Sequence, residues 1–367
     1  MRRFFSFVRE IIRKSVIAFF VTLSVSSALF LPLFFLLVGT VALSSDVFFD
    51  SLTTVYAYGK VTSSHKILAV PIRGIIFGDA ESDSDPFLFS LLSDTYGYDI
   101  KRILRKAAED SSIKAILLEI NSPGGTIYGS QAIADGIRDY QSQTNKPVYA
   151  HVSGFAASGA YWAAVGADKI IADAGSIIGS IGVINGQFFV YNNPYALDNG
   201  ILGGGVTTKD GVQFYSITSG KGKDLGNPFR SPTAEELQIL QRGADANYAL
   251  FVQRVSERRG IPVDTIRNDI GAYVYDNDTA IQKKLLDMTG SREFAYAELA
   301  KVAEISDNYQ VVRVKDRRSR FDMLLNAFFS RHLSSAREDF ARRLKAEFCT
   351  PYRPLVYYGD VSLVCGK

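Results

Sequence analysis

The chain has 367 residues, of which 47% are hydrophobic and 22% are charged, and its formal net charge is +3. This length allows one large domain or two small ones, and the composition is that of a globular protein. The nearly balanced charge argues against nucleic acid as a partner, because phosphate binding needs a concentrated basic face. The dense basic run at residues 313–320 is interpreted as a solvated surface or one that faces lipid headgroups.

The N-terminal 45 residues have the charge pattern of a membrane anchor. Residues 1–14 form a basic head, and residues 15–45 contain no charged side chain. About 20 helical residues cross a hydrocarbon core of roughly 30 Å, whereas the apolar core of a cleavable signal peptide has only about 7–15. The sequence therefore predicts one transmembrane helix, with the N-terminus in the cytoplasm and the following domain outside it.

Strand and helix signals alternate after the predicted anchor. Strands are expected at residues 66–76, 113–120, 148–152 and 169–172, and helices at 100–110 and 131–140. This order predicts right-handed β-α-β crossovers and a parallel sheet, an α/β fold. Further on, the sequence predicts a Gly-rich loop at residues 200–211, a strand at residues 212–218 and a long amphipathic helix at residues 233–259. The start signal of that helix is Pro232 and Thr233 before Glu235 and Glu236.

Ser158 lies in a segment of small residues, 154–166, between a predicted strand and a helix. A hydroxyl there is open to a substrate backbone, and the N–H groups of the helix start favour a developing oxyanion. The alternative is a tight contact between helix and sheet, with Ser158 as an N-cap. A second signal is the Pro-Gly-Gly turn within residues 121–125, because ligands of parallel sheets bind at the carboxyl ends of the strands.

A serine nucleophile needs a base. None of the three histidines, His65, His151 and His332, stands in a context typical of one. A lysine can serve when burial lowers its pKa toward neutrality. Lys221 and Lys223 are the two candidates, in a Gly-containing turn that follows a predicted strand.

Four segments occur in order at residues 120–125 (INSPGG), 156–161 (AASGAY), 179–183 (GSIGV) and 219–224 (SGKGKD). Together they resemble the bacterial signal peptide peptidase A family, membrane-bound serine peptidases of the ClpP/crotonase fold. The resemblance covers about residues 66–287. It is looser at residues 271–287, where Lys284 stands in place of an expected glycine.

The resemblance implies a role for each matching residue. Ser158 would be the nucleophile, Lys223 the general base, and the Gly124 and Gly159 N–H groups the oxyanion hole. It also implies a ring-like homo-oligomer in the bacterial inner membrane, with the catalytic domain on the periplasmic side. Implied substrates are remnant signal peptides and other short or unfolded polypeptides, without cofactor or metal. The peptidase domain is expected at residues 60–310, and a C-terminal helix and tail at residues 311–367.

Three alternatives stay open at this point. The same catalytic pair, Ser158 and Lys223, would serve a peptidase that processes a specific membrane protein, such as a stomatin-like partner. A crotonase-fold acyl-CoA enzyme uses similar N–H donors but needs cytoplasmic coenzyme A, which the predicted topology denies. The third is a catalytically silent scaffold. Cys349 and Cys365, both near the C-terminus, could form a disulfide outside the cytoplasm.

Overall fold

The structure is a computed structural model that describes residues 13–21, 24, 30, 52–79, 94–186, 217–227, 230–306, 308–314 and 355–357. The chain divides into two compact units, Met1–Leu52 and Thr53–Lys367. Most of the predicted anchor, His332 and both cysteines lie outside the described residues. The proposed domain limits at 60–310 and 311–367 stay a prediction.

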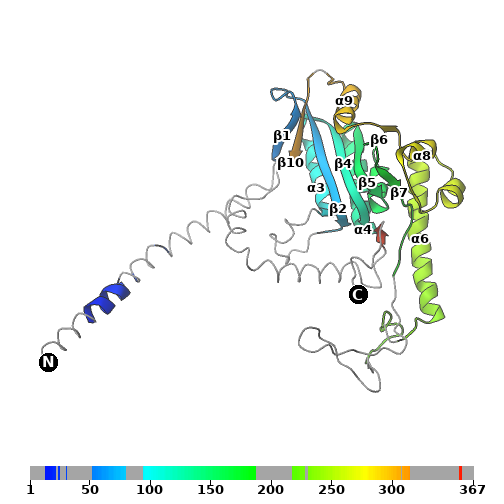
Figure 1. Ribbon diagram of the computed structural model, residues 1–367, viewed down its shortest axis with the longest axis horizontal. Helices are drawn as coiled ribbons and strands as arrows, with labels where there is room; N and C mark the ends of the chain where they lie inside the picture. Colours follow the sequence, from blue (N-terminus) through cyan, green and yellow to red (C-terminus); the bar gives the residue numbers. More distant parts are fainter. Residues whose placement is uncertain are drawn as a thin grey trace. The chain divides into compact units, whose positions relative to one another are not determined.

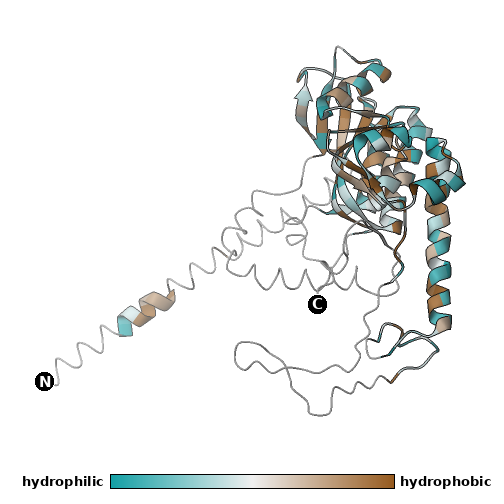
Figure 2. Cartoon of the chain, turned by 45° about the vertical axis from the view of Figure 1, so that its right-hand side comes forward, coloured by the Kyte–Doolittle hydropathy of each residue, from teal (hydrophilic) through white to brown (hydrophobic). Residues whose placement is uncertain are grey.

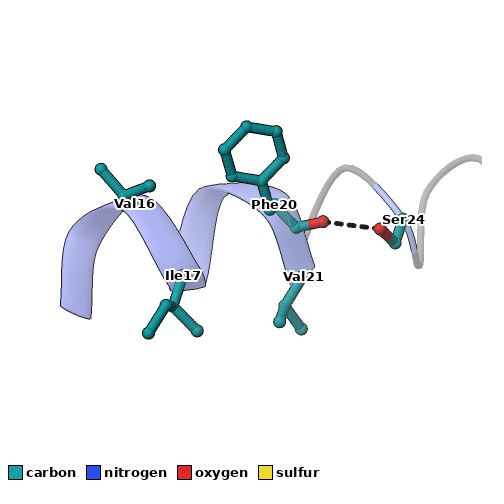
Figure 3. Close-up of a pocket in the computed structure, with 5 residues that line it drawn as sticks. All are labelled: Val16, Ile17, Phe20, Val21 and Ser24. Atoms are coloured by element: carbon teal, nitrogen blue, oxygen red, sulfur yellow. Dashed lines mark hydrogen bonds between the residues drawn. The ribbon is translucent and has the colours of Figure 1, made fainter. Parts of the chain in front are cut away.

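The described part of the first unit is mainly a helical segment at residues 13–21. Figure 3 shows its apolar side chains, with the Ser24 hydroxyl donating a hydrogen bond of 2.8 Å to the Phe20 carbonyl. Val16, Ile17, Phe20 and Val21 are all exposed. Within the described residues, no helix combines the length and the apolar character that a membrane span requires.

The second unit is built on a mostly parallel sheet, which confirms the α/β prediction. Along its main path the strand order is β1-β10-β2-β4-β5-β6-β9 (Figure 1). The β1–β10 pair is antiparallel, and every other pair on this path is parallel. The bounds are β1 Thr54–Gly59, β2 Lys66–Phe77, β4 Ile113–Thr126, β5 Val148–Ala157, β6 Lys169–Ala172, β9 Met288–Thr289 and β10 Gln310–Val314.

Helices cover both faces of this sheet, as buried parallel strands require. The helices α3 (Gly97–Glu109) and α4 (Ile127–Thr144) pack together and against β2. The other face carries α9 (Arg292–Val302), which packs on β4 and β5. Alternate strand residues such as Ile67 and Leu117 join the buried cluster under α9. Figure 2 shows the resulting hydrophobic colouring of the central strands.

Two central strands run further than the sequence predicts. The expected turn at residues 121–125 is part of β4, which continues to Thr126, and β5 continues to Ala157. Beyond the main path, β7 (Ile177–Gly179) pairs parallel with β5 and antiparallel with β8 (Val274–Tyr275). The short strands β3 (Thr95–Tyr96) and β11 (Leu355–Tyr357) pair with β2 and β4. These extensions carry the sheet past the predicted strand ends to the residues of the candidate site.

The longest described helix is α6 (Ala234–Arg259), as predicted from its periodicity and its start signal. Thr233 and Glu236 form the predicted capping box, and Gly260 ends the helix with φ +63°. The Phe251 ring packs on Trp162 of α5 (Gly159–Ala164), with ring centroids 4.7 Å apart. Beyond this contact the N-terminal part of α6 extends away from the sheet (Figure 1).

Three short helical segments complete the description. They are α7 (Val263–Thr265), the π-helix η2 (Ile266–Ile270) and α8 (Asn277–Gln282). Lys284, which follows α8, has φ +60°. This is the left-handed region that glycine adopts at least cost. The position where the family resemblance expects glycine is therefore one where the backbone favours it.

Candidate active site

Ser158 occupies a strained turn between β5 and α5. Its backbone has φ +55° and ψ −118°, which side-chain-bearing residues rarely adopt. The turn is held on both sides, because the Ser158 N–H donates to the Gly179 carbonyl at 2.8 Å and its carbonyl accepts from Trp162 N–H at 2.9 Å. A sharp strand-to-helix turn that presents a serine is the arrangement of a nucleophile elbow.

The Ser158 hydroxyl is buried and unused. The residue is 1% exposed, and its Oγ makes no hydrogen bond within the described structure. Although Ser158 stands at the N-cap position of α5, its side chain does not cap the helix. Of the alternative interpretation, capping of the helix by the Ser158 side chain is therefore wrong, although Ser158 does hold the N-cap position. A buried polar atom left without a partner costs free energy, which makes the Ser158 hydroxyl a candidate functional group.

Gly124 lies on β4 just past the last residue pair that β4 shares with β5, which is Ser122 with Ala156. Gly124 itself pairs with Ile75 of β2 and with Tyr357 of β11. The helix α5, which begins directly after Ser158, packs against β4. Gly124 has φ +106°, and its N–H donates to the Ser122 hydroxyl at 3.1 Å. The turn of Ser158 and the glycine segment of β4, 34 positions apart in the sequence, are thus linked through the packing of α5 on β4.

Gly159 is the second residue expected at the oxyanion hole. It is the first residue of α5, where N–H groups have no acceptor within the helix. Gly159 and Ala160 are both buried and small, so the helix start lies close to the sheet. The N–H of Gly159 is therefore a backbone donor directly next to Ser158 in the chain.

The segment at residues 179–182 contacts the Ser158 turn through a backbone hydrogen bond. Gly179 has φ +128°, and a Cβ atom there would lie 2.6 Å from the Tyr273 carbonyl. Ser180 has φ +56°, and its N–H donates to the same carbonyl at 2.7 Å. The contact between Ser158 N–H and the Gly179 carbonyl explains why this motif accompanies the serine in the sequence.

The described histidines lie away from Ser158. His151 is buried on β5, seven residues before Ser158, or about 23 Å along an extended strand. Its Nε2 lies 3.2 Å from the Gly290 carbonyl, and burial lowers its pKa. His65 precedes β2 and contacts the Asn308 carbonyl. Among the described residues, neither histidine can act as the base of Ser158.

Lys223 lies in an exposed turn, which we call the lysine turn (residues 219–227). Neither Lys221 nor Lys223 is buried in the single chain, so the expected burial of the base is not provided by its described residues. Lys221, whose side chain is 83% exposed, forms an ion pair with Glu235 at the start of α6. Lys223 has no such pair within the described part of the chain.

The structure does not bring Lys223 to Ser158 within one chain. The lysine turn is joined to the start of α6 near Glu236, whereas α6 meets α5 at Phe251. These two positions are 15 residues apart, which is about 22 Å along a helix. The described chain thus holds Ser158 and Lys223 at separate places.

Sequence reasoning missed a buried ionic cluster beneath α9. Glu119 of β4, 3% exposed, accepts two hydrogen bonds from Arg313 Nη2, at 2.7 and 3.0 Å, and one from the Tyr296 hydroxyl at 2.6 Å. Arg313 was interpreted as part of a solvated basic run, and this is wrong for that residue. Glu119 stands in the apolar strand segment 113–120, and this isolated charge is the signal that could have revealed the cluster.

No group of three or more metal-ligating side chains occurs among the described residues. The site chemistry at hand is a buried hydroxyl, a strained turn and backbone N–H donors. Such a set stabilises the oxyanion of acyl transfer once a base removes the serine proton.

Comparison with known proteins agrees with this chemistry. Residues 140–306 match the family model "Peptidase family S49", and residues 83–174 match the "Clp protease" model. An inferred protease of Synechocystis sp. is 31% identical over 58% of this chain and 71% of its own length. The chain belongs to peptidase family S49. The Clp protease match supports a ClpP-like α/β fold for this S49 member.

Two further relatives are similar over a comparable region. An inferred protease of Methanocaldococcus jannaschii is 33% identical over 56% of this chain and 61% of its own length. An inferred signal peptide peptidase SppA of Enterococcus faecium is 31% identical over 67% of this chain and 66% of its own length. The chain thus spans less than two thirds of the length of these two relatives. A solved structure, a ClpP1 mutant from Listeria monocytogenes, aligns with 14% identity and a TM-score of 0.37, covering 61% of this chain and 92% of that one.

Proposed function

We propose that this S49 member is a serine endopeptidase with a Ser158–Lys223 dyad. The observation that carries the proposal is the strained Ser158 turn, with its buried hydroxyl free of any hydrogen bond to the described residues. A structural serine would cap the helix or bond to a neighbour, whereas a nucleophile has to keep its hydroxyl available.

The proposed mechanism assigns a step to each of these groups. Neutral Lys223 accepts the proton of Ser158 Oγ as the oxygen attacks the peptide carbonyl. The N–H groups of Gly124 and Gly159 stabilise the oxyanion, and the carbonyl oxygen takes over the Gly124 donor from the Ser122 hydroxyl. The protonated lysine then gives its proton to the leaving amine. Water, activated by the same amine, hydrolyses the acyl-enzyme and regenerates Ser158.

We further propose that Lys223 reaches Ser158 of a neighbouring copy in a ring-like homo-oligomer. The separation along α6 supports this arrangement, as does the exposure of Lys223 in the single chain. The pairing of Lys221 with Glu235 favours Lys223 as the base. Three large apolar side chains of α6, Leu237, Ile239 and Leu250, are half exposed and suit a contact between copies.

The proposed substrates are remnant signal peptides and other short or unfolded polypeptides. An extended peptide would bind by pairing with the β4 edge beside the serine. The pairing of β11 with Gly124, Gly125 and Thr126 in antiparallel register supports this mode, because it places a strand on that edge. The proposed location of the catalytic domain is the outer side of a bacterial inner membrane, to which a single transmembrane anchor at residues 15–45 would attach it.

The test of the activity uses the full chain in detergent. A fluorophosphonate probe, which reacts with activated serines, should label Ser158 and block cleavage of a synthetic signal-peptide fragment. Ser158→Ala should lose both labelling and cleavage. Ser153→Ala, on the strand β5 that leads to Ser158, is the matched control and should keep both labelling and cleavage. Labelling that persists in Ser158→Ala would assign the nucleophile elsewhere.

The proposed topology has a separate test. Intact cells are treated with a membrane-impermeant thiol reagent, before and after reduction, to probe Cys349 and Cys365. Labelling only after reduction supports an external disulfide, whose closed loop would contribute about 3 kcal/mol. Labelling that requires lysis of the cells would contradict the topology.

A further inference from the structure

The lysine turn is fastened to the outer end of α6 by one guanidinium group. Arg230 donates from Nε to Asp224 Oδ2 at 2.7 Å and from Nη2 to Asp224 Oδ1 at 2.9 Å. The same side chain donates from Nη1 to Glu236 Oε2 at 2.9 Å and from Nη2 to Glu236 Oε1 at 2.8 Å. Both contacts are bidentate, the geometry in which arginine binds carboxylates most strongly and most directionally.

Both acidic residues belong to a defined piece of backbone structure. Asp224 directly follows Lys223, and its carbonyl accepts the Asn227 N–H at 3.1 Å within the turn. Glu236 belongs to the capping box of α6, where its Oε2 accepts the Thr233 N–H at 2.8 Å. Arg230 therefore links the residue next to the proposed base to the first turn of a long helix.

The three side chains are shielded more than an ordinary surface ion pair. The side chains of Arg230, Asp224 and Glu236 are 29%, 31% and 11% exposed. Lys221 and Glu235 form a second ion pair nearby, with side chains 83% and 55% exposed. Exposed ion pairs of that kind contribute little to stability, whereas a shielded, bidentate network keeps its side chains in one fixed arrangement.

We infer that Arg230 is a positioning residue, which holds the lysine turn on the start of α6 so that Lys223 is presented to the serine site in a fixed place. The inference rests on the proposed role of Lys223 as the base. It adds a function for a side chain that touches neither substrate nor serine. We call the group of Arg230, Asp224 and Glu236 the arginine clamp.

The clamp also sets the charge around Lys223. The described ionisable groups about the lysine turn are Lys221, Asp224, Arg230, Glu235 and Glu236. Without Arg230, the carboxylates of Asp224 and Glu236 would lack their shared counter-charge. Uncompensated carboxylates stabilise a nearby ammonium, so the amine would lose its proton only at higher pH.

The test compares Arg230→Ala and Arg230→Lys with Glu235→Gln in the full chain. Glu235→Gln is the matched control, because it removes the neighbouring ion pair but leaves the clamp intact. Arg230→Ala should lower kcat by about 10²-fold with a smaller change in KM, as expected for a displaced catalytic group. Its activity should also rise only at higher pH. Arg230→Lys should recover part of kcat, because lysine keeps the charge but not the fork.

Two readouts separate the clamp from the proposed function. Amide hydrogen exchange should speed up in Arg230→Ala at the N–H groups of Lys223, Leu225 and Asn227, which donate within the turn, while β4 and β5 stay protected. Adding Asp224→Asn to Arg230→Ala should return the pH profile toward the wild type. Exchange as slow as in the wild type, or an activity loss no larger than that of Glu235→Gln, would overturn the inference. If the wild-type chain cleaves no peptide, the proposed function fails. In that case the hydrogen-exchange result alone decides whether Arg230 holds the lysine turn on α6.

Discussion

Ser158 and Lys223 are held by two different kinds of structure. Ser158 is fixed by the sheet, since neighbouring strands, a short buried helix and the Gly179 carbonyl all contact its turn. Lys223 lies in an exposed turn whose main support is a network of charged side chains. The comparison teaches that one half of the proposed dyad is positioned by the hydrophobic core, and the other by electrostatics at the end of a helix.

The largest expected effect comes from the serine half. Ser158→Ala should lower turnover by about 10⁶-fold, as knockouts of the nucleophile do in other serine peptidases. Folding should be unaffected, because the lost oxygen makes no hydrogen bond to the described residues. Peptide cleavage and thermal unfolding measure the two outcomes. Retention of more than a few per cent of activity would exclude Ser158 as nucleophile.

Removing the lysine tests the other half. Lys223→Ala should be nearly as damaging as Ser158→Ala, and Lys221→Ala mild, because Lys221 pairs with Glu235. Activity of the wild type should rise with pH as the amine of the base loses its proton. Steady-state rates across pH measure both. An inactive Lys221→Ala variant beside an active Lys223→Ala would reverse the assignment.

Mixing the two inactive variants tests whether the halves come from different copies. If Lys223 serves the serine of a neighbour, some sites in a mixed oligomer combine an intact serine with an intact lysine. An equal mixture of Ser158→Ala and Lys223→Ala, dissociated and reassembled, should regain about a quarter of wild-type activity by random heterologous pairing. A dyad formed within one chain would give no recovery.

Substitution of the buried Glu119 should change the stability of the sheet without affecting the lysine turn. Burial opposes ionisation of Glu119, but the hydrogen bonds from Arg313 and Tyr296 outweigh it and hold the pKa of this carboxyl below its ordinary value of 4.5. The ion pair of Glu119 with Arg313 therefore stabilises the fold fully above about pH 4.5. This contribution is lost as the pH falls through the lowered pKa of Glu119. Glu119→Gln should cost about 3 kcal/mol at neutral pH and weaken the acid dependence of unfolding.

Denaturant unfolding at several pH values measures this effect. Glu298→Gln, which breaks the exposed pair with Lys301 on α9, is the control and should change stability by less than about 1 kcal/mol. Equal losses in the two variants would contradict the special role of the buried cluster.

The smallest expected effect concerns the strained position after α8. Lys284 has φ +60°, so Lys284→Gly relieves a left-handed backbone at some cost in chain entropy. The net gain should be about 0.5 kcal/mol in the free energy of unfolding, with activity unchanged. Lys283→Gly, at φ −83°, should destabilise instead. A loss of stability in Lys284→Gly would show that side-chain contacts outweigh the backbone strain.

The sequence by itself determined the alternation of strands and helices, the long helix with its capping box, and the four motifs of the family. These are local signals, because hydrophobic period, cap residues and turn residues act within a few positions. They were sufficient to select Ser158 and the glycine turn as candidates. The capping box at Thr233 and Glu236, predicted from residue types alone, is present as expected.

Only the tertiary structure decided how those candidates are used. The packing of α5 on β4 linked the turn of Ser158 to the strand that carries Gly124, and the missing side-chain hydrogen bond of Ser158 showed that its side chain does not cap α5. The contact of Arg313 with Glu119, 194 positions away, overturned the view of that arginine as solvated. The separation of Lys223 from Ser158 depends on where α6 meets α5. Such facts depend on contacts between residues distant in sequence, which local propensity does not encode.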